Sequence, residues 1–293
     1  MLCACIDIGS NTTRLLVADV RDGTLSEVLA RRAFTRLGRE LRATGAVNPG
    51  KVAEIAEIVR EQRALAESVG AEAIATVATA AIRTATNRSD LVREIRAIAG
   101  VEVDVLDGEE EARLAFVGAT RTLSEPPEGR VGVVDVGGGS TEIAVGTLRE
   151  GVTWSVSLPV GSGFLADAYL KADPPSAAEL NAIREHTAGC FDGLDVPQPA
   201  SAVAVGGSAT SVRRLVGASL DPGSIDRALR VLSGADSAQV AATFGLDAER
   251  VRLLPAGLLV LAECAAVLGR PLQIGRGGIR EGVCLELGAV ADS

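Results

Sequence analysis

Aromatic residues are scarce in this sequence. They make up 2% of its 293 residues, with one Trp, one Tyr and five Phe. Proteins that read single-stranded nucleic acids stack bases on aromatic side chains, so a protein of that class is not expected. Basic residues number 29 against 38 acidic ones, and the net charge of −9 disfavours general electrostatic binding to nucleic acids or membranes. The sequence therefore predicts no nucleic-acid partner and no membrane partner.

Histidines and paired cysteine motifs are also lacking. His186 is the only histidine, which excludes a Ser-His-Asp triad, and without a CxxC motif a Cys/His zinc site is not expected. The five cysteines are an odd number, so we expect free, buried thiols in a cytoplasmic protein. Asp7 interrupts the N-terminal apolar run, so no signal peptide is expected. The apolar segment 253–268 is short and contains Glu263, which predicts a buried helix.

Length and patterning predict two α/β domains. Hydrophobic residues make up 47% of the chain, which is enough for a large core. The stretch 124–129, Ser-Glu-Pro-Pro-Glu-Gly, is typical of a linker, so we expect domains at 1–124 and 125–293. The last helix is expected to pack back on the first domain. Short strands alternate with helices along the whole chain, which indicates an α/β fold.

One internal repeat links the two halves. Residues 7–17, Asp-Ile-Gly-Ser-Asn-Thr-Thr-Arg-Leu-Leu-Val, align without gaps to residues 135–145, Asp-Val-Gly-Gly-Gly-Ser-Thr-Glu-Ile-Ala-Val. Each copy reads as a strand, an Asp-x-Gly turn and a second strand. The repeat predicts a duplicated domain with a central cleft between the halves.

The turns of the repeat are candidate phosphate sites. Small polar residues after a strand expose backbone N–H groups, which can form an anion-binding nest. A single turn of this kind is more often an ordinary hairpin turn, but two gapless copies favour the functional interpretation. A third Gly-rich turn leads from a strand into a helix and is informative only together with the other two. The predicted phosphate-binding residues of the three turns are Gly9, Ser10, Asn11 and Thr12; Gly137, Gly138, Gly139, Ser140 and Thr141; and Gly206, Gly207 and Ser208.

The aligned copies differ in charge at one position. Arg14 in the first copy corresponds to Glu142 in the second. Arg14 is predicted to clamp phosphate oxygens. Glu142 and Asp135 are predicted to hold a hydrated Mg²⁺ or Mn²⁺ ion, and Asp7, the counterpart of Asp135, is predicted as a further metal ligand. The alternative for each residue alone is a surface charge at a strand end.

Glu111 is a candidate general base. It lies in the run Glu109-Glu110-Glu111 after Asp107, and carboxylates in a first helical turn also serve as caps and favour the helix dipole. That structural explanation covers Glu109 and Glu110. Glu111 has apolar residues at i+3, i+4 and i+7, so its carboxylate is expected to point inward, where it could accept a proton.

Several motifs together resemble one enzyme family. The run 6–16, the Glu-Glu-Ala-Arg-Leu run 110–114, the run 134–142 and the Arg-Glu-Gly run 280–282 are similar to motifs of the exopolyphosphatase/guanosine pentaphosphatase family, in order along nearly the whole chain. Shorter matches lie at 36–38, 80–83, 206–210 and 254–257. With one histidine the chain lacks the HD-type motif of the longer members, so it resembles the short, two-domain form.

The resemblance implies a fold and a mechanism. The fold would be two ribonuclease-H-like domains of the actin/sugar-kinase/Hsp70 superfamily. The activity would be Mg²⁺-dependent hydrolysis of the terminal phosphate of inorganic polyphosphate, with water activated by Glu111. Asp135 and Glu142 match the family's acidic residues at the metal and phosphates, and Arg83 matches an arginine expected to contact the polyanion.

Other functions stay open on the sequence alone. The same machinery suits a guanosine pentaphosphate (pppGpp) 5′-phosphohydrolase. A sugar kinase is disfavoured by the short chain and by Glu rather than Asp at the base. A non-catalytic phosphate- or alarmone-sensing module is disfavoured because Glu111, Asp135 and Glu142 are all present. A homodimer is neither required nor excluded.

Overall fold

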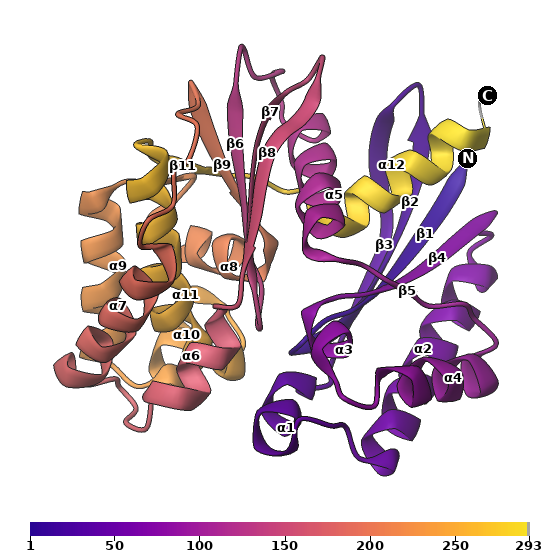
Figure 1. Ribbon diagram of the computed structural model, residues 1–293, viewed down its shortest axis with the longest axis horizontal. Helices are drawn as coiled ribbons and strands as arrows, with labels where there is room; N and C mark the ends of the chain where they lie inside the picture. The colour runs from indigo at the N-terminus through magenta and orange to yellow at the C-terminus, as the bar shows by residue number, and fades with distance from the viewer. Residues whose placement is uncertain (292–293) are drawn as a thin grey trace. The chain divides into compact units, whose positions relative to one another are not determined.

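The chain forms two compact units in a computed structural model that describes residues 1–291. Unit 1 contains Met1–Thr122 together with the segment from Gly277 onward, and unit 2 contains Leu123–Arg276. Figure 1 shows the elements of both units. The sequence analysis placed 125–293 in the second domain with the last helix returning to the first. In the structure that helix, α12 (Ile279–Ala291), is part of unit 1.

Unit 1 is a five-stranded sheet with helices on both faces (Figure 1). The strand order is β3-β2-β1-β4-β5. The pairs β3–β2 and β2–β1 are antiparallel, and the pairs β1–β4 and β4–β5 are parallel. Besides α12, its elements are β1 (Leu2–Ile8), β2 (Thr12–Arg21), β3 (Thr24–Phe34), α1 (Leu37–Thr44), α2 (Pro49–Ser68), β4 (Ala73–Ala78), α3 (Ala80–Thr84), α4 (Arg88–Ala99), β5 (Asp104–Val105) and α5 (Gly108–Arg121).

The apolar run of β1 is explained by burial of both sheet faces. Ala4, Ile6 and Ile8 pack with side chains of α2 and α4 on one face. Cys3 and Cys5 pack with α5 and α12 on the other. A strand covered on both sides has no solvent-facing positions, so its sequence does not alternate. All five cysteines of the chain are free thiols, and all except Cys190 are buried, as predicted.

Helices α5 and α12 approach each other closely. A Cβ atom at Gly282 of α12 would lie 2.2 Å from the carbonyl oxygen of Leu114 in α5. Only glycine permits this separation of the two backbones. The Gly of the Arg-Glu-Gly run therefore fixes α12 against the helix that carries Glu111.

Unit 2 contains a six-stranded sheet in the order β10-β11-β9-β6-β7-β8. Its elements are β6 (Val131–Val136), β7 (Thr141–Thr147), β8 (Gly151–Leu158), α6 (Ser162–Tyr169), α7 (Ala177–Phe191), β9 (Ser201–Val205), α8 (Gly206–Val216), β10 (Ser219–Leu220), α9 (Pro222–Gly234), α10 (Ser237–Phe244), α11 (Ala248–Leu268) and β11 (Leu272–Ile274).

The apolar segment 253–268 lies inside α11, the central helix of the unit 2 core. By length and composition α11 is the one helix among the described residues that could cross a membrane, but 61% of its most apolar window is buried in the protein. Its residues Leu254, Leu258 and Leu261 are nearly or fully buried in the same cluster as the strands β6, β7 and β9. The prediction of a buried core helix is confirmed.

The duplication extends from the repeat to the sheets. The order β3-β2-β1-β4-β5 in unit 1 matches β8-β7-β6-β9-β11 in unit 2. In both, the repeat forms an antiparallel pair, β1 with β2 and β6 with β7, and the first strand of each pair is parallel to the next strand inward, β4 or β9. The predicted α/β fold with two related halves is confirmed.

Candidate active site

The two turns of the repeat have the same hydrogen-bonded frame. In unit 1 the Gly9 N–H donates to the Thr12 carbonyl at 3.0 Å. In unit 2 the Gly137 N–H donates to the Ser140 carbonyl, also at 3.0 Å. Gly9 aligns with Gly137 and Thr12 with Ser140, so the gapless alignment made from sequence corresponds to equivalent turns.

In the first turn, two backbone carbonyls accept hydrogen bonds from the segment that leads into α1. Gly38 N–H donates to the Ser10 carbonyl at 2.7 Å, and Arg36 N–H donates to the Asn11 carbonyl at 3.0 Å. In a trans peptide the C=O and the following N–H point in opposite directions. The N–H groups of Asn11 and Thr12 therefore point away from this segment, as an anion nest requires.

In the second turn, the N-terminus of α6 donates the corresponding hydrogen bonds to backbone carbonyls. Ser162 N–H donates to the Gly137 carbonyl and Phe164 N–H to the Gly138 carbonyl, both at 2.9 Å. By the same geometry the N–H groups of Gly138 and Gly139 point away from α6.

One predicted contact of the second turn is not supported. Thr141 is fully buried, and its hydroxyl donates to the Val160 carbonyl at 2.6 Å. The Thr141 side chain thus holds the turn against the core, which leaves the backbone N–H groups as the candidate phosphate donors of this turn.

Asp7 and Arg14 are cross-strand neighbours near the first turn. Oδ1 of Asp7 is buried without a hydrogen-bond partner. Burial raises the pKa of Asp7, while the positive charges of Arg280 and Arg14 oppose that rise. Two guanidinium groups near Asp7 repel a divalent cation, so the predicted role of Asp7 as a metal ligand is not supported by its surroundings.

Asp135 and Glu142 are the corresponding cross-strand pair in unit 2. They are 9% and 2% exposed, and Ser157 of β8 donates its hydroxyl to Glu142 Oε1 at 2.8 Å. The two carboxylates lie directly opposite each other on adjacent strands, at the end of β6 next to the second turn. Their assignment as cation ligands stays a prediction.

The third glycine turn lies directly against Asp135. Gly206 has φ 80°, and a Cβ atom there would lie 2.0 Å from Asp135 Oδ1. The position needs glycine both for its backbone conformation and for the carboxylate beside it. Ser208, in contrast, is 1% exposed and faces α11, where a Cβ atom at Gly257 would lie 2.8 Å from its Oγ. The Ser208 side chain therefore packs in the core and does not line the turn.

Glu111 lies in the first turn of α5, on its buried face. The helix begins after Asp107, whose side chain accepts a hydrogen bond from the Glu110 N–H at 2.9 Å. Glu110 forms an ion pair with Arg113 at 2.7 Å, whereas Glu111 is 2% exposed. The predicted inward orientation of Glu111 is confirmed.

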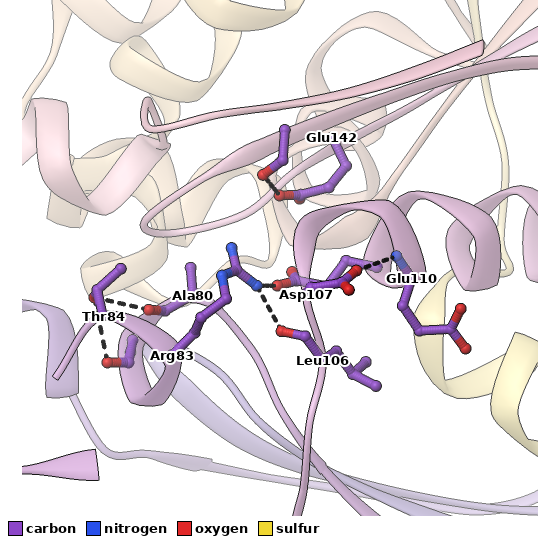
Figure 2. A network of polar contacts seen from close by, with 10 residues as sticks. Ala80, Arg83, Thr84, Leu106, Asp107, Glu110 and Glu142 are labelled. Carbon is purple, nitrogen blue, oxygen red and sulfur yellow. Dashed lines mark hydrogen bonds and ion pairs between the residues drawn. The ribbon is translucent and has the colours of Figure 1, made fainter.

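Arg83 of α3 forms an ion pair with Glu111. Figure 2 shows Arg83 with its contact to Leu106, close to the start of α5. Its guanidinium forms a close ion pair with Oε1 of Glu111 and donates to the Leu106 carbonyl at 2.8 Å. A buried carboxylate needs such a partner to stay ionised. Sequence reasoning assigned Arg83 to the polyanion, and the structure shows in addition that it holds the candidate base.

Three residues that border these groups received no role from the sequence. The positive charge of Arg280 opposes the rise in the pKa of Asp7, and the Ser157 hydroxyl donates a hydrogen bond to Glu142. Arg250 is 7% exposed, and its Nη2 would lie 2.3 Å from a Cβ atom at Gly207. A signal was present for one of them, since Arg280 begins a family motif, whereas Arg250 has charged neighbours at Glu249 and Arg252 and is not distinguished by sequence.

A divalent cation would be held by few protein ligands. No group of three or more His, Cys, Asp or Glu side chains among residues 1–291 is arranged to bind a metal. Mg²⁺ is commonly held by one or two carboxylates together with water and substrate phosphates. The pair of Asp135 and Glu142 fits this pattern.

Comparisons with known proteins point to one family of phosphatases. The sequence profile of the Ppx/GppA phosphatase family matches residues 16–289. The chain is 30% identical to "Exopolyphosphatase 1" of Mycobacterium tuberculosis over 298 aligned positions, covering 96% of this chain and 86% of that protein. It is 29% identical to "Guanosine-5′-triphosphate,3′-diphosphate pyrophosphatase" of Aeromonas hydrophila, covering 96% of this chain but 58% of that protein.

Solved structures give the same result. A crystal structure of the Aquifex aeolicus Ppx/GppA family member has a TM-score of 0.84 and 28% identity, covering 100% of this chain and 99% of that one. An exopolyphosphatase from Cytophaga hutchinsonii, 17% identical, shares the fold with a TM-score of 0.87 over 99% of this chain and 98% of that one. The chain therefore has the fold of the Ppx/GppA proteins. With motifs, topology and relatives in agreement, the chain belongs to the Ppx/GppA phosphatase family.

Proposed function

We propose that this enzyme is an exopolyphosphatase, a phosphoric anhydride hydrolase that releases the terminal phosphate of inorganic polyphosphate. The observation that carries the proposal is the buried Glu111 held by Arg83. A phosphate-sensing module needs donors for the anion but has no use for a buried carboxylate, which is unfavourable to desolvate. A hydrolase needs that group to accept the proton of the attacking water.

Each group has its own proposed role. Glu111 takes the water proton, and Arg83 keeps its carboxylate ionised and oriented. The N–H groups of the two repeat turns donate to phosphate oxygens, and Arg14 adds a charge-assisted donor. Phosphoryl transfer depends mainly on such positioning and charge stabilisation.

The proposed cofactor is Mg²⁺ or Mn²⁺, bound by Asp135 and Glu142. Ser157 orients Glu142, and Gly206 leaves space for the carboxylate of Asp135. When bound, such a cation neutralises charge on the phosphate oxygens. The position of both carboxylates beside the second turn, where carboxylate oxygens could serve as ligands of a hard cation, supports this assignment.

A guanosine pentaphosphate 5′-phosphohydrolase is the second candidate, because a relative at 29% identity is named "Guanosine-5′-triphosphate,3′-diphosphate pyrophosphatase". The groups described above bind a chain of phosphates and do not distinguish the two substrates.

Phosphate release from purified protein decides between the functions. Long-chain polyphosphate, pppGpp and ATP are assayed in parallel, with Mg²⁺ and with a chelator. We expect the highest kcat/KM for polyphosphate and no turnover with the chelator. Preference for pppGpp would select the second candidate. Binding of phosphates without any release would instead indicate a sensing module.

A further inference from the structure

Unit 1 carries a dense group of exposed arginines next to the first turn. The stretch 31–42 contains Arg31, Arg32, Arg36, Arg39 and Arg42, and all five are exposed. We call these residues the arginine strip. With one acidic residue in the stretch, its formal charge is 5 − 1 = +4, in a chain whose net charge is −9. The strip runs from the end of β3 through α1.

The strip is attached directly to the candidate phosphate turn. Arg36 and Gly38 donate backbone hydrogen bonds to the carbonyls of Asn11 and Ser10 at 3.0 and 2.7 Å. A Cβ atom at Gly38 would lie 3.2 Å from Arg42 Nη1 and 3.4 Å from Ser10 Cβ. The guanidinium of Arg42 is therefore near the turn, and the rest of the strip leads away from it.

The arginines are brought together despite mutual repulsion. Arg32 of β3 lies opposite Arg14 of β2 in the sheet register. Partial burial and then the charge of Arg39 lower the pKa of Arg42. Like charges on neighbouring residues repel each other, and a polyanion bound along the strip would interact favourably with several of them at once.

The acidic residue of the stretch faces another partner. Oε1 of Glu40 accepts a hydrogen bond from the Asn48 N–H at 2.7 Å and also contacts the Asn48 side-chain amide. The Glu40 carboxylate is thus engaged by Asn48, the residue at the start of α2. From Arg36 to Arg42 the strip spans about 9 Å along α1 at the usual helical rise, which is longer than the turn itself.

We infer that the arginine strip binds the distal part of a long polyphosphate chain, beyond the phosphates held by the first turn. This inference rests on the proposed function for the identity of the ligand. A polyphosphate chain is a flexible row of closely spaced charges, and exposed arginines in series match it. The strip would raise affinity for long chains and leave short ones unaffected.

A binding experiment tests the strip apart from hydrolysis. The Glu111→Gln variant prevents turnover, and Arg32→Ala/Arg39→Ala is added to it. The matched control adds Arg60→Ala/Arg93→Ala, which removes the same charge from exposed positions of α2 and α4. Long-chain polyphosphate and tripolyphosphate are titrated into each protein by calorimetry at several salt concentrations.

The strip variant is expected to bind long-chain polyphosphate about three- to tenfold more weakly than the control, the size expected for two exposed ion pairs. The slope of log K against log salt should fall by roughly 1–2. Tripolyphosphate should bind both variants equally.

Three results would overturn the inference: equal weakening for tripolyphosphate, equal weakening in the control, or competition by single-stranded RNA at the same charge concentration. Because binding is measured, a protein that hydrolyses no polyphosphate but shows the strip effect would contradict the proposed function and leave this inference standing.

Discussion

The turn of unit 1 and the equivalent turn of unit 2 have the same backbone frame but differ in charge at one aligned position. Asp7 lies across from Arg14, whereas Asp135 lies across from Glu142. The first pair is neutral in sum and the second carries two negative charges. One difference between the duplicated turns therefore changes the formal charge of the pair from zero to −2, while the glycine and its hydrogen bond stay the same.

The flanking segments differ in the same sense. The first turn adjoins the arginine strip, which supplies further positive charge. The second turn is covered by α6, whose first residues bring glycines and a serine against it. Gly161, for example, would place a Cβ atom 2.6 Å from the Gly138 carbonyl carbon. Unit 1 is thus built for charge contacts and unit 2 for close backbone packing around two carboxylates.

The largest expected effect comes from the base in unit 1. Glu111→Gln should lower kcat by roughly 10²–10⁴-fold while substrate binding is kept, the usual range for loss of a general base. Glu109→Gln, an exposed residue two positions earlier, is the control and should change little. Steady-state kinetics and a binding titration measure both quantities. If the Glu109 variant were inactive and the Glu111 variant active, the assignment of the base to Glu111 would be wrong.

Exchange of charge at the aligned position should separate the two turns. Arg14→Gln should raise KM about 10- to 100-fold, because a charge-assisted bond to phosphate is lost, without changing the Mg²⁺ requirement. Glu142→Gln should raise the Mg²⁺ concentration for half activity by about tenfold or more, since one anionic oxygen is lost at a hard-cation site. Mg²⁺ titrations of activity for both variants make the comparison. The same change in both would mean that the turns are not specialised.

The glycine beside Asp135 offers a matched pair of substitutions. Gly206 and Gly217 flank α8 with φ of 80° and 86°, but only Gly206 has a carboxylate where a Cβ atom would be. Gly217→Ala should lower stability by about 1–2 kcal/mol through backbone strain alone. Gly206→Ala should add displacement of Asp135, a several-fold loss of activity and a weaker response to Mg²⁺. Thermal unfolding and activity with increasing Mg²⁺ check this, and equal effects would remove Asp135 from the site.

The smallest effect concerns the stability contribution of Asp7. Because burial raises its pKa in the folded protein, the native state binds this proton more tightly than the unfolded state. Stability from this group therefore falls as pH rises from the unfolded pKa through the folded one. Asp7→Asn should stabilise the protein at neutral pH by about 0.5–2 kcal/mol, with the gain vanishing below about pH 4. Denaturant unfolding at both pH values measures this. A loss of stability at neutral pH would show that the arginines outweigh burial.

The sequence by itself determined the duplication and the chemical groups. The gapless repeat led to equivalent turns, and the spacing on α5 was sufficient to turn Glu111 inward and leave Glu110 with Arg113. These features depend on neighbours within a few residues, where local geometry and side-chain period decide the outcome. The buried core helix was likewise readable, although its start was not. We expected it over 253–268, but α11 begins at Ala248 and continues through Pro255, because burial in the core outweighs the lost hydrogen bond.

Only the tertiary structure decided which groups meet. The sequence analysis did not predict β3, α1 or α9. Strand β3 is an edge strand in which seven of eleven positions are exposed and several are charged, so its sequence lacks a clear period. The pairing of Arg83 with Glu111, the contact of Gly206 with Asp135 and the inward rotation of Ser208 and Thr141 join residues 19 to 71 positions apart in the chain. Such contacts follow from the order of strands and the close approach of helices, which no local pattern encodes.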